Sequence, residues 1–378
     1  MNRKTLISVS LAAGLALGMA AYPAVKQIEQ QQALTAAAAN ESGVTTDGWY
    51  YTAYDTYCEI TGGNEFVQGN VAIPASIILK DGVTTLPVKK VREIYYSCED
   101  ITGLTIPESV TVLPNQFCEL KKNLQTVTFE GELVSLPNSA FLSCSSLTTV
   151  KMPKGLMTIG NSAFGKCTRL ESIQLPNTVS TIENYAFKGC ESLKSITVPG
   201  SVTKIPEGML SGCTALQKVT LEDGIKTVGS SAFENCSSLT EVTIPKSVTS
   251  LGVNSPFSGC SNLESVTFEN PECEIGNIYG TAEKPLTIYG YEGSSAEKYC
   301  VNRDKNFGEK SYVIFKSIGE KPAPQPVQDT GLFCDANGDE TVDVTDAQLV
   351  LNYYVQSMAG KNPSWYELTK NPKAPDAP

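Results

Sequence analysis

The chain has 378 residues, a net charge of −11 and no histidine. Its acidic balance, without any basic stripe, argues against nucleic acid and anionic membrane surfaces as partners. Without an imidazole, Ser-His-Asp and Cys-His nucleophilic machinery and His-ligated catalytic zinc are excluded. Chemistry that uses two carboxylates alone is the hydrolytic mechanism left to weigh.

The amino terminus predicts export. Arg3 and Lys4 precede an apolar run from Leu6 to Ala21, and small residues follow, which is the pattern of a secretory signal peptide. The run is short and interrupted by Ser and Gly, so a membrane anchor is the weaker interpretation. We therefore expect residues 1–39 to be a signal peptide and leader, and no later run reaches the about 18 apolar residues that a membrane span needs.

A segment of the form LxxVxV recurs through the middle of the chain. Apolar residues at its positions 1, 4 and 6 predict a short strand with one buried face, and an Ala-Phe pair and a Cys follow in most copies. A fixed period in this range predicts stacked coils, which bury a continuous core only together. We therefore predict a mainly β and irregular solenoid over residues 98–270, with about eight rungs. The first apolar residues of the copies, in steps of 23 and finally 24, are Ile101, Leu124, Leu147, Leu170, Leu193, Leu216, Leu239 and Leu263.

This pattern resembles the BspA-type leucine-rich repeat, a bacterial extracellular family, over roughly residues 44–318. Residues 44–97, which include "GGNEFVQGNVAIPASIILKDGVTTLPVKKV", resemble the amino-terminal cap hairpin of that family. Residues 271–318, which include "LTIYGYEGSSAEKYC", resemble its closing segment, with a short helix from about Ser295. The chain departs from the repeat at Leu210, which replaces the Phe, and at Cys118, which lies three residues early relative to its Leu.

The twelve cysteines would by default predict disulfides in an exported chain. Six of them, however, hold one position in successive coils, so their side chains point the same way and their Cβ vectors converge poorly for bridging. We predict that this cysteine ladder consists of buried free thiols. Its members are Cys144, Cys167, Cys190, Cys213, Cys236 and Cys260. One disulfide stays open as a possibility among Cys58, Cys273, Cys300 and Cys334.

The exposed positions of the predicted strands form two rows, mainly of Thr and Ser, which suit a solvated strand surface. One row is Thr128, Lys151, Gln174, Thr197, Thr220, Thr243 and Thr267. The next row is Thr126, Thr149, Ser172, Ser195, Lys218, Glu241 and Ser265. Glu241 is the only acid in either row, so the rows lack the carboxylate pair of a glycosidase, and they lack aromatic platforms for sugar stacking. We expect no catalytic residues and a polar scaffold that binds protein or glycan weakly.

Composition changes at residues 319–331, a Pro-rich stretch that indicates an extended linker. The segment "DANGDETVDVTD" then places oxygen donors with the spacing of an EF-hand calcium loop. The predicted Ca²⁺ ligands are Asp335, Asn337, Asp339, Thr341 through its backbone carbonyl, Asp343 and Asp346. An amphipathic helix is expected after this loop.

Asp at loop position 12, with a helix after the loop and none before it, resembles the type I dockerin, and residues 332–378 are identified as a dockerin-like module. The resemblance implies calcium-dependent docking to a cohesin of a cellulosome-type, polysaccharide-degrading complex. Two departures are Glu340 at the usual Gly position and a single loop where dockerins carry two. The cohesin-contact positions carried over from the family are Val344, Thr345, Leu351, Asn352 and Gln356.

The sequence thus predicts a secreted, non-catalytic leucine-rich repeat binding or scaffold protein that docks onto a cohesin of a scaffoldin. One alternative is a glycoside hydrolase or another polysaccharide-active subunit of the same complex. The other is a free adhesin or host-facing surface protein whose tail is vestigial.

Overall fold

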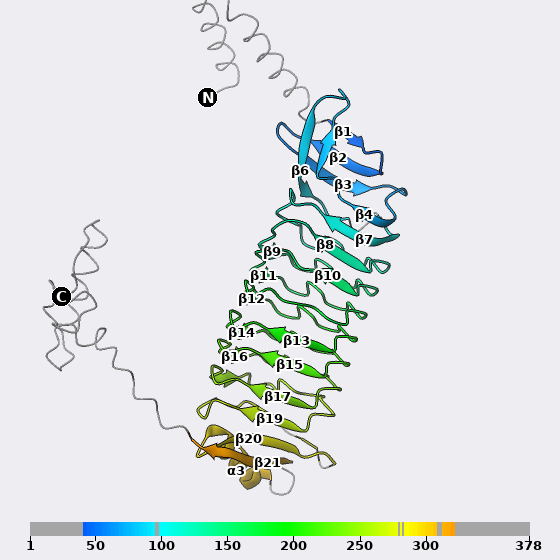
Figure 1. The fold of residues 1–378 in the computed structure, drawn as a ribbon. Helices are drawn as coiled ribbons and strands as arrows, with labels where there is room; N and C mark the ends of the chain where they lie inside the picture. Colours follow the sequence, from blue (N-terminus) through cyan, green and yellow to red (C-terminus); the bar gives the residue numbers. More distant parts are fainter. Residues whose placement is uncertain (1–40, 95–97, 279, 282, 308–311, 322–378) are drawn as a thin grey trace, which may run out of the picture. The chain divides into compact units, whose positions relative to one another are not determined.

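The part of the chain that ends at Glu320 is a solenoid of stacked coils with a β cap at its amino end and a strand–helix–strand cap at its carboxyl end (Figure 1). The structure is a computed structural model, and it describes residues 41–94, 98–278, 280–281, 283–307 and 312–321. The predicted signal peptide and leader (1–39) and the dockerin-like module (332–378) lie outside these residues. In the described part, no helix is long and apolar enough to cross a membrane.

One long strand from most coils joins a parallel sheet along the solenoid. These strands are β4 (Gly69–Ala72), β7 (Ile101–Ile106), β8 (Thr126–Phe129), β10 (Thr149–Lys151), β13 (Ser195–Val198), β15 (Lys218–Leu221), β17 (Glu241–Ile244), β19 (Ser265–Phe268), β20 (Leu286–Glu292) and β21 (Val313–Glu320). Their hydrogen-bonded order is β4-β7-β8-β10, then β13-β15, then β17-β19-β20-β21, written here in chain order. We call them together the long sheet. Partner residues lie one repeat apart, as Val150 and Val127 do.

A second column of two-residue strands faces the long sheet across each coil (Figure 1). Its members are β9 (Ser135–Leu136), β11 (Thr158–Ile159), β12 (Thr181–Ile182), β14 (Lys204–Ile205), β16 (Thr227–Val228) and β18 (Ser250–Leu251). Each strand buries its second residue, which is always Leu, Ile or Val, and points its first outward. The repeat therefore supplies both walls of one continuous core, as the sequence predicts.

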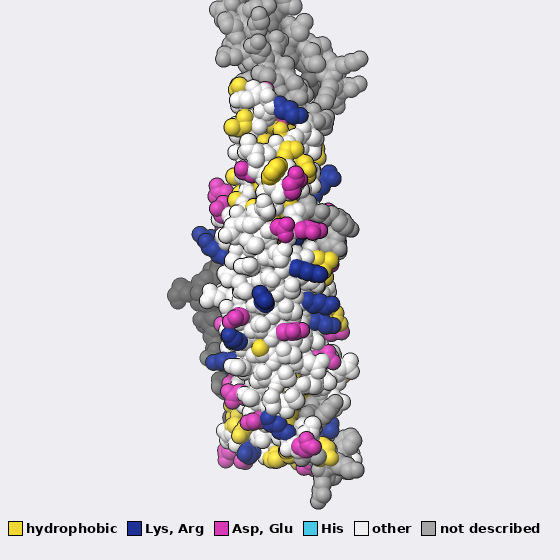
Figure 2. All heavy atoms as spheres, turned by 90° about the vertical axis from the view of Figure 1, so that its right-hand side faces the viewer, with side chains coloured by type: hydrophobic (Ala, Val, Ile, Leu, Met, Phe, Trp, Pro, Cys, Tyr) yellow, Lys and Arg dark blue, Asp and Glu magenta, His cyan; other side chains and the backbone are white. Residues whose placement is uncertain are grey.

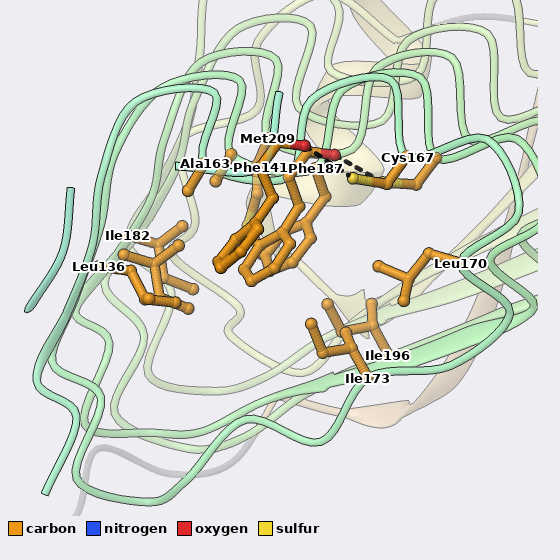
Figure 3. Packing of buried hydrophobic residues seen from close by; sticks show 14 of the residues in the cluster. Leu136, Phe141, Ala163, Cys167, Leu170, Ile173, Ile182, Phe187, Ile196 and Met209 are labelled. Atoms are coloured by element: carbon orange, nitrogen blue, oxygen red, sulfur yellow. Dashed lines mark hydrogen bonds between the residues drawn. The ribbon is translucent and has the colours of Figure 1, made fainter. Parts of the chain in front are cut away.

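Stacked phenylalanines fill the space between the two walls. The ring centroids of Phe141 and Phe164 lie 5.5 Å apart, and those of Phe164 and Phe187 lie 5.4 Å apart. Figure 3 shows the rings of Phe141 and Phe187 pointing between the two walls of the coil. The column is interrupted at Leu210, but there Met209 replaces the repeated Ala, and both side chains are completely buried. The larger Met209 thus compensates for the smaller Leu210, and the core remains packed at this coil.

Two left-handed residues bracket the Ala-Phe position in most of the described coils and turn the chain sharply. Ser162 and Lys166 hold these positions with φ of 52° and 57°, and Gly189 holds the second position of the next coil with φ of 71°. Asparagines support the same turns, since the amide N–H of Asn161 donates to Oδ1 of Asn138 in the preceding coil at 2.8 Å. These turns aim the following Cys into the core.

The amino-terminal cap is a five-stranded sheet rather than a single hairpin. Its strands, in the order β1-β2-β3-β6-β5, are β1 (Ser42–Val44), β2 (Trp49–Ala53), β3 (Cys58–Gly63), β6 (Thr85–Val91) and β5 (Ser76–Ile78). β4 lies within the segment expected as cap, yet it pairs with β7 and starts the long sheet at Gly69. Trp49 joins the two parts, because its buried indole donates from Nε1 to the carbonyl of Ala72 at 3.0 Å.

At the carboxyl end, α3 (Ser295–Phe307) begins where the helix was expected. The side chains of Ser294 and Glu297 cap its first turn, since Ser294 Oγ accepts from the Glu297 N–H and Glu297 Oε2 accepts from the Gly293 N–H at 2.7 Å. β20 and β21 flank this helix in sequence and extend the long sheet, and β21 continues to Glu320, inside the segment predicted as linker.

Candidate functional site

The cysteine ladder is a structural feature of the core. Each ladder Sγ donates to a backbone carbonyl of the preceding coil at 3.0 to 3.3 Å. The carbonyl of Phe164, for example, accepts from both the N–H of Cys167 and the Sγ of Cys190. Burial raises the pKa of Cys144 and of Cys213 to about 12, so these thiols are protonated and unreactive at neutral pH. All eleven cysteines in the described residues, including Cys58, Cys273 and Cys300, are free thiols, while Cys334 lies outside.

Cys118 is not an early member of the ladder, and our alignment of that coil was wrong. Its N–H donates to the carbonyl of Ala140, and its carbonyl accepts from Cys144 Sγ, which are the contacts that a repeated Phe makes in other coils. Cys118 therefore stands at the Phe position, and Lys121 stands at the ladder position. Lys121 is only 3% exposed, and burial lowers its pKa.

The outer face of the long sheet is the candidate site. In β13, Ser195 and Thr197 are exposed while Ile196 and Val198 are buried, because successive side chains of a strand point to opposite faces. Neighbouring strands then align equivalent residues, such as Thr197 with Thr220. This register confirms the two predicted rows.

The first row extends beyond the residues that the sequence identified. Thr267 pairs with Tyr289 in β20, and Tyr289 pairs with Lys316 in β21. The Lys316 Nζ lies 5.9 Å from the centroid of the Tyr289 ring. Beyond Thr267, where the predicted row ends, the outer face therefore carries an aromatic side chain. Tyr289 follows Thr267 by 22 residues, one short of the period, so the repeat spacing alone did not reach it.

A first shallow hollow opens between β10 and residues 172–176, where the long sheet is interrupted. It has a volume of about 470 Å³. Residues 172–176 form no strand, and only Ser172 bridges to Ser195. The polar residues that line the hollow are Thr148, Thr149, Lys151, Ser172 and Gln174.

The local sequence explains this interruption. Lys151 and Gln174 replace the Thr of the exposed row. Met152 and Leu175 replace the β-branched residue that Val198 supplies in the coil after Leu175. Unbranched side chains favour strands less than β-branched ones do. Met152 and Leu175 are also only half-buried, so the floor of the first hollow is apolar.

A second hollow, of about 550 Å³, opens between β15 and β17, where the long sheet is interrupted again. Its charged lining residues are Lys218, Asp223, Glu241 and Glu269. The sequence rows did not reveal this cluster of carboxylates, because Asp223 and Glu269 follow their strands and stand outside the rows. Asp223 is paired with Lys246, whose Nζ lies 3.2 Å from its Oδ2.

This carboxylate cluster does not suit acid–base catalysis. A glycosidase needs one carboxyl group whose pKa is raised, usually by an apolar, buried environment. Asp223, Glu241 and Glu269 are all exposed to solvent. In the described part of the chain, no group of three or more Cys, Asp and Glu side chains is placed to hold a metal ion.

On other parts of the solenoid, acidic and basic side chains of neighbouring coils form ion pairs. Glu171 and Lys194 form an ion pair of 2.7 Å, and the hydrogen bond from Lys194 lowers the pKa of Glu171. Glu264 and Lys284 form another of 3.2 Å. Figure 2 shows one side of the solenoid, with basic and acidic side chains interspersed between its ends and hydrophobic ones gathered toward the caps. Such exposed pairs contribute little stability.

The predicted calcium and cohesin residues cannot be placed on this framework. The loop from Asp335 to Asp346 and the contact positions from Val344 to Gln356 lie outside the described residues.

Comparison with known proteins identifies the repeat. The sequence model of the BspA type leucine rich repeat region matches residues 89–207 and 157–279, with six copies. A leucine-rich repeat protein from Bacteroides ovatus is 24% identical, with 74% of this chain and 79% of that chain covered and a TM-score of 0.55. A leucine rich cell surface protein from Faecalibacterium prausnitzii is 28% identical, with a TM-score of 0.42, and the match covers 61% of this chain and 55% of that one. No curated protein matches the chain.

The match to Bacteroides ovatus supports the fold, and the two family matches together span half of the chain. The coil period, the paired walls and the internal cysteine ladder agree with that assignment. The chain belongs to the BspA-type leucine-rich repeat family.

Proposed function

We propose that the chain is a secreted, cell-surface-associated, non-catalytic binding protein whose long sheet presents its outer face to a protein or glycan. The observation that carries this proposal is the in-register outer face, with its rows of hydroxyl side chains and two hollows. The predicted signal peptide supports export, and the cell-surface description of the Faecalibacterium prausnitzii protein agrees with it.

The test of this face is a pair of substitutions with a matched control. Thr197→Arg and Thr220→Arg place bulky charges on the outer face, whereas Thr181→Arg places one on the exposed position of β12, in the opposite wall. We expect Thr197→Arg and Thr220→Arg to weaken binding of any ligand retained from a panel of plant-wall polysaccharides and purified extracellular proteins. Loss of ligand binding in Thr181→Arg, but not in the other two variants, would place the binding surface on the wall that contains β12.

We further propose that residues 332–378 dock this protein onto a cohesin of a cellulosome through Ca²⁺. The proposal rests on the oxygen-donor spacing from Asp335 to Asp346. In the absence of calcium, the four carboxylates predicted as ligands repel one another in one short loop. A hard cation bound by their oxygens would remove that repulsion.

Retention of the full chain on immobilised cohesins tests the docking. We expect retention in calcium, release by chelator and loss in Asp335→Ala. Glu340→Gly restores the usual loop glycine and is the matched control, which we expect to retain binding. Cohesin binding that persists in chelator and in Asp335→Ala would contradict the docking proposal and favour a free adhesin.

A polysaccharide-active enzyme is a second candidate, because Asp223, Glu241 and Glu269 share one hollow. Their exposure argues against it, and we expect no hydrolysis of plant-wall polysaccharides by the purified chain. Hydrolysis that disappears in Glu241→Gln or Glu269→Gln would establish the enzyme instead.

A further inference from the structure

The two hollows occupy equivalent positions in the repeat. Thr148 lines the first and Gln217 lines the second, 69 residues later, which is three repeats of 23. Strands of one sheet lie about 4.8 Å apart, so the hollows are separated by about 14 Å along the solenoid. Two equivalent recesses at a fixed separation suit one extended ligand that lies across the strands and enters both.

The two hollows carry charges of opposite sign. Among the described residues that line the first hollow, Lys151 is the only charged one. In the second, Lys246 neutralises Asp223, so the carboxylates of Glu241 and Glu269 outnumber the ammonium group of Lys218. The first hollow therefore favours an anionic group, and the second favours a cationic group.

We propose that the outer face of the long sheet binds an extended polypeptide, with an acidic side chain in the first hollow and a basic side chain in the second. The proposal rests on the proposed function of this face and specifies its ligand class. An extended chain advances about 3.4 Å per residue, so four residues span about 14 Å. Residues i and i+4 also point to the same side of an extended chain, so both side chains can enter their hollows together.

The chemistry of the face favours a peptide over a neutral polysaccharide. The described residues that line the two hollows include no aromatic side chain on which a sugar ring could stack. The hydroxyl group of Thr197 lies on the coil between the hollows, and that of Thr220 lines the second hollow beside it, where both can exchange hydrogen bonds with a peptide backbone. The apolar floor of the first hollow, from Met152 and Leu175, accommodates the methylene group of an acidic side chain.

Synthetic peptides test the spacing on the full chain. Twelve-residue Gly/Ser/Thr peptides would carry one Asp and one Lys separated by two, four or six positions, and binding would be measured by fluorescence anisotropy. We expect the four-residue spacing to bind about two- to fivefold more tightly than the others, which is the range for exposed ion pairs. Replacing the peptide Asp with Asn should remove that advantage. Equal affinity at all spacings would overturn the proposal.

A charge reversal supplies an independent readout. Lys151→Glu makes both hollows negative, so the preferred peptide should change to one with two Lys four positions apart. Lys204→Glu makes the same charge change on the exposed position of β14, in the opposite wall, and should leave the preference unchanged. An unchanged preference in Lys151→Glu would contradict the proposed pairing.

The same assays separate this inference from the proposed function. Suppose that oligosaccharides bind more tightly than any peptide and that Thr197→Arg abolishes their binding. The outer face would then remain a binding surface, but the assignment of a peptide as its ligand would be wrong. Absence of binding to peptides, oligosaccharides and proteins alike would contradict both.

Discussion

Raising the pH above 9 should unfold the solenoid, because the native stack holds cysteines neutral that would otherwise ionise. Burial disfavours the thiolate and raises the pKa of each of these cysteines, to about 12 for Cys144 and Cys213. In the unfolded chain their pKa returns to its ordinary value near 9. The unfolded state then releases protons that the folded state keeps, so the free energy of unfolding falls as pH rises from about 9 toward 12. The eight thiols concerned, whose pKa is raised by burial, are Cys58, Cys118, Cys144, Cys167, Cys190, Cys213, Cys273 and Cys300.

The loss is large compared with the stability of a typical domain. Between pH 9 and pH 10, a thiol that ionises only when unfolded lowers the free energy of unfolding by about 1 kcal/mol. Eight such thiols lower it by about 8 kcal/mol, whereas whole domains are stable by about 5 to 15 kcal/mol. Lys121 acts in the opposite direction, since burial lowers its pKa, but this single group opposes eight thiols.

Urea denaturation followed by far-UV circular dichroism, in a phosphine reductant at pH values from 7.5 to 10.5, measures this dependence. The matched variant replaces four ladder thiols with alanine, at Cys144, Cys167, Cys190 and Cys213. Cavities will make this variant less stable at pH 8, but it should lose about half of the alkaline slope, because it removes four of the eight thiols. A slope near zero in the parent chain, or an equal slope in the variant, would refute the explanation.

Three further outcomes follow from the packing. Alkylating the denatured mature protein without reductant should label at least the six ladder thiols, and ladder disulfides would contradict the buried-thiol assignment. Leu193→Ala should lower the free energy of unfolding, measured in urea titrations, by about 2 to 5 kcal/mol. Amide hydrogen exchange should become faster in the adjacent coils as well as in its own. Faster exchange confined to the mutated coil would argue against energetic coupling between adjacent coils. Gly189→Ala should cost about 1 kcal/mol, because its φ is 71° and the nearest atom to an added Cβ lies 3.6 Å away. Lys166→Gly, at the equivalent position, should introduce no such backbone strain. Equal decreases in the free energy of unfolding for the two variants would argue against strain as the cause.

The repeat made the regular coils predictable from sequence. A fixed period assigns every position one environment, so Leu170, Phe164 and Cys167 identify their counterparts in other coils without knowledge of the fold. The period also fixes the register, and therefore the two exposed rows. Helix α3 was predictable for a different reason, because Ser294 and Glu297 form a local capping pattern.

The remaining features depend on interactions that the period does not encode. The pairing of β4 with β7 joins residues from the cap to the first regular coil, and nothing in the spacing indicates it. Tyr289 enters the exposed row after a step of 22 residues. The hollows depend on where neighbouring strands separate, which follows from the combined strand preference of adjacent coils.

Core positions in a stacked repeat are restricted by both neighbouring coils, whereas exposed positions can vary at little cost in stability. A ligand that contacted only the uniform Thr rows could shift by one rung without losing a contact, because each rung presents the same group. Binding at one register needs side chains that differ from the repeat. Lys151 and Glu241 are such departures in the exposed rows, and each lies at an interruption of the long sheet. Two hollows of unlike charge, three rungs apart, would fix both the position and the direction of an extended chain.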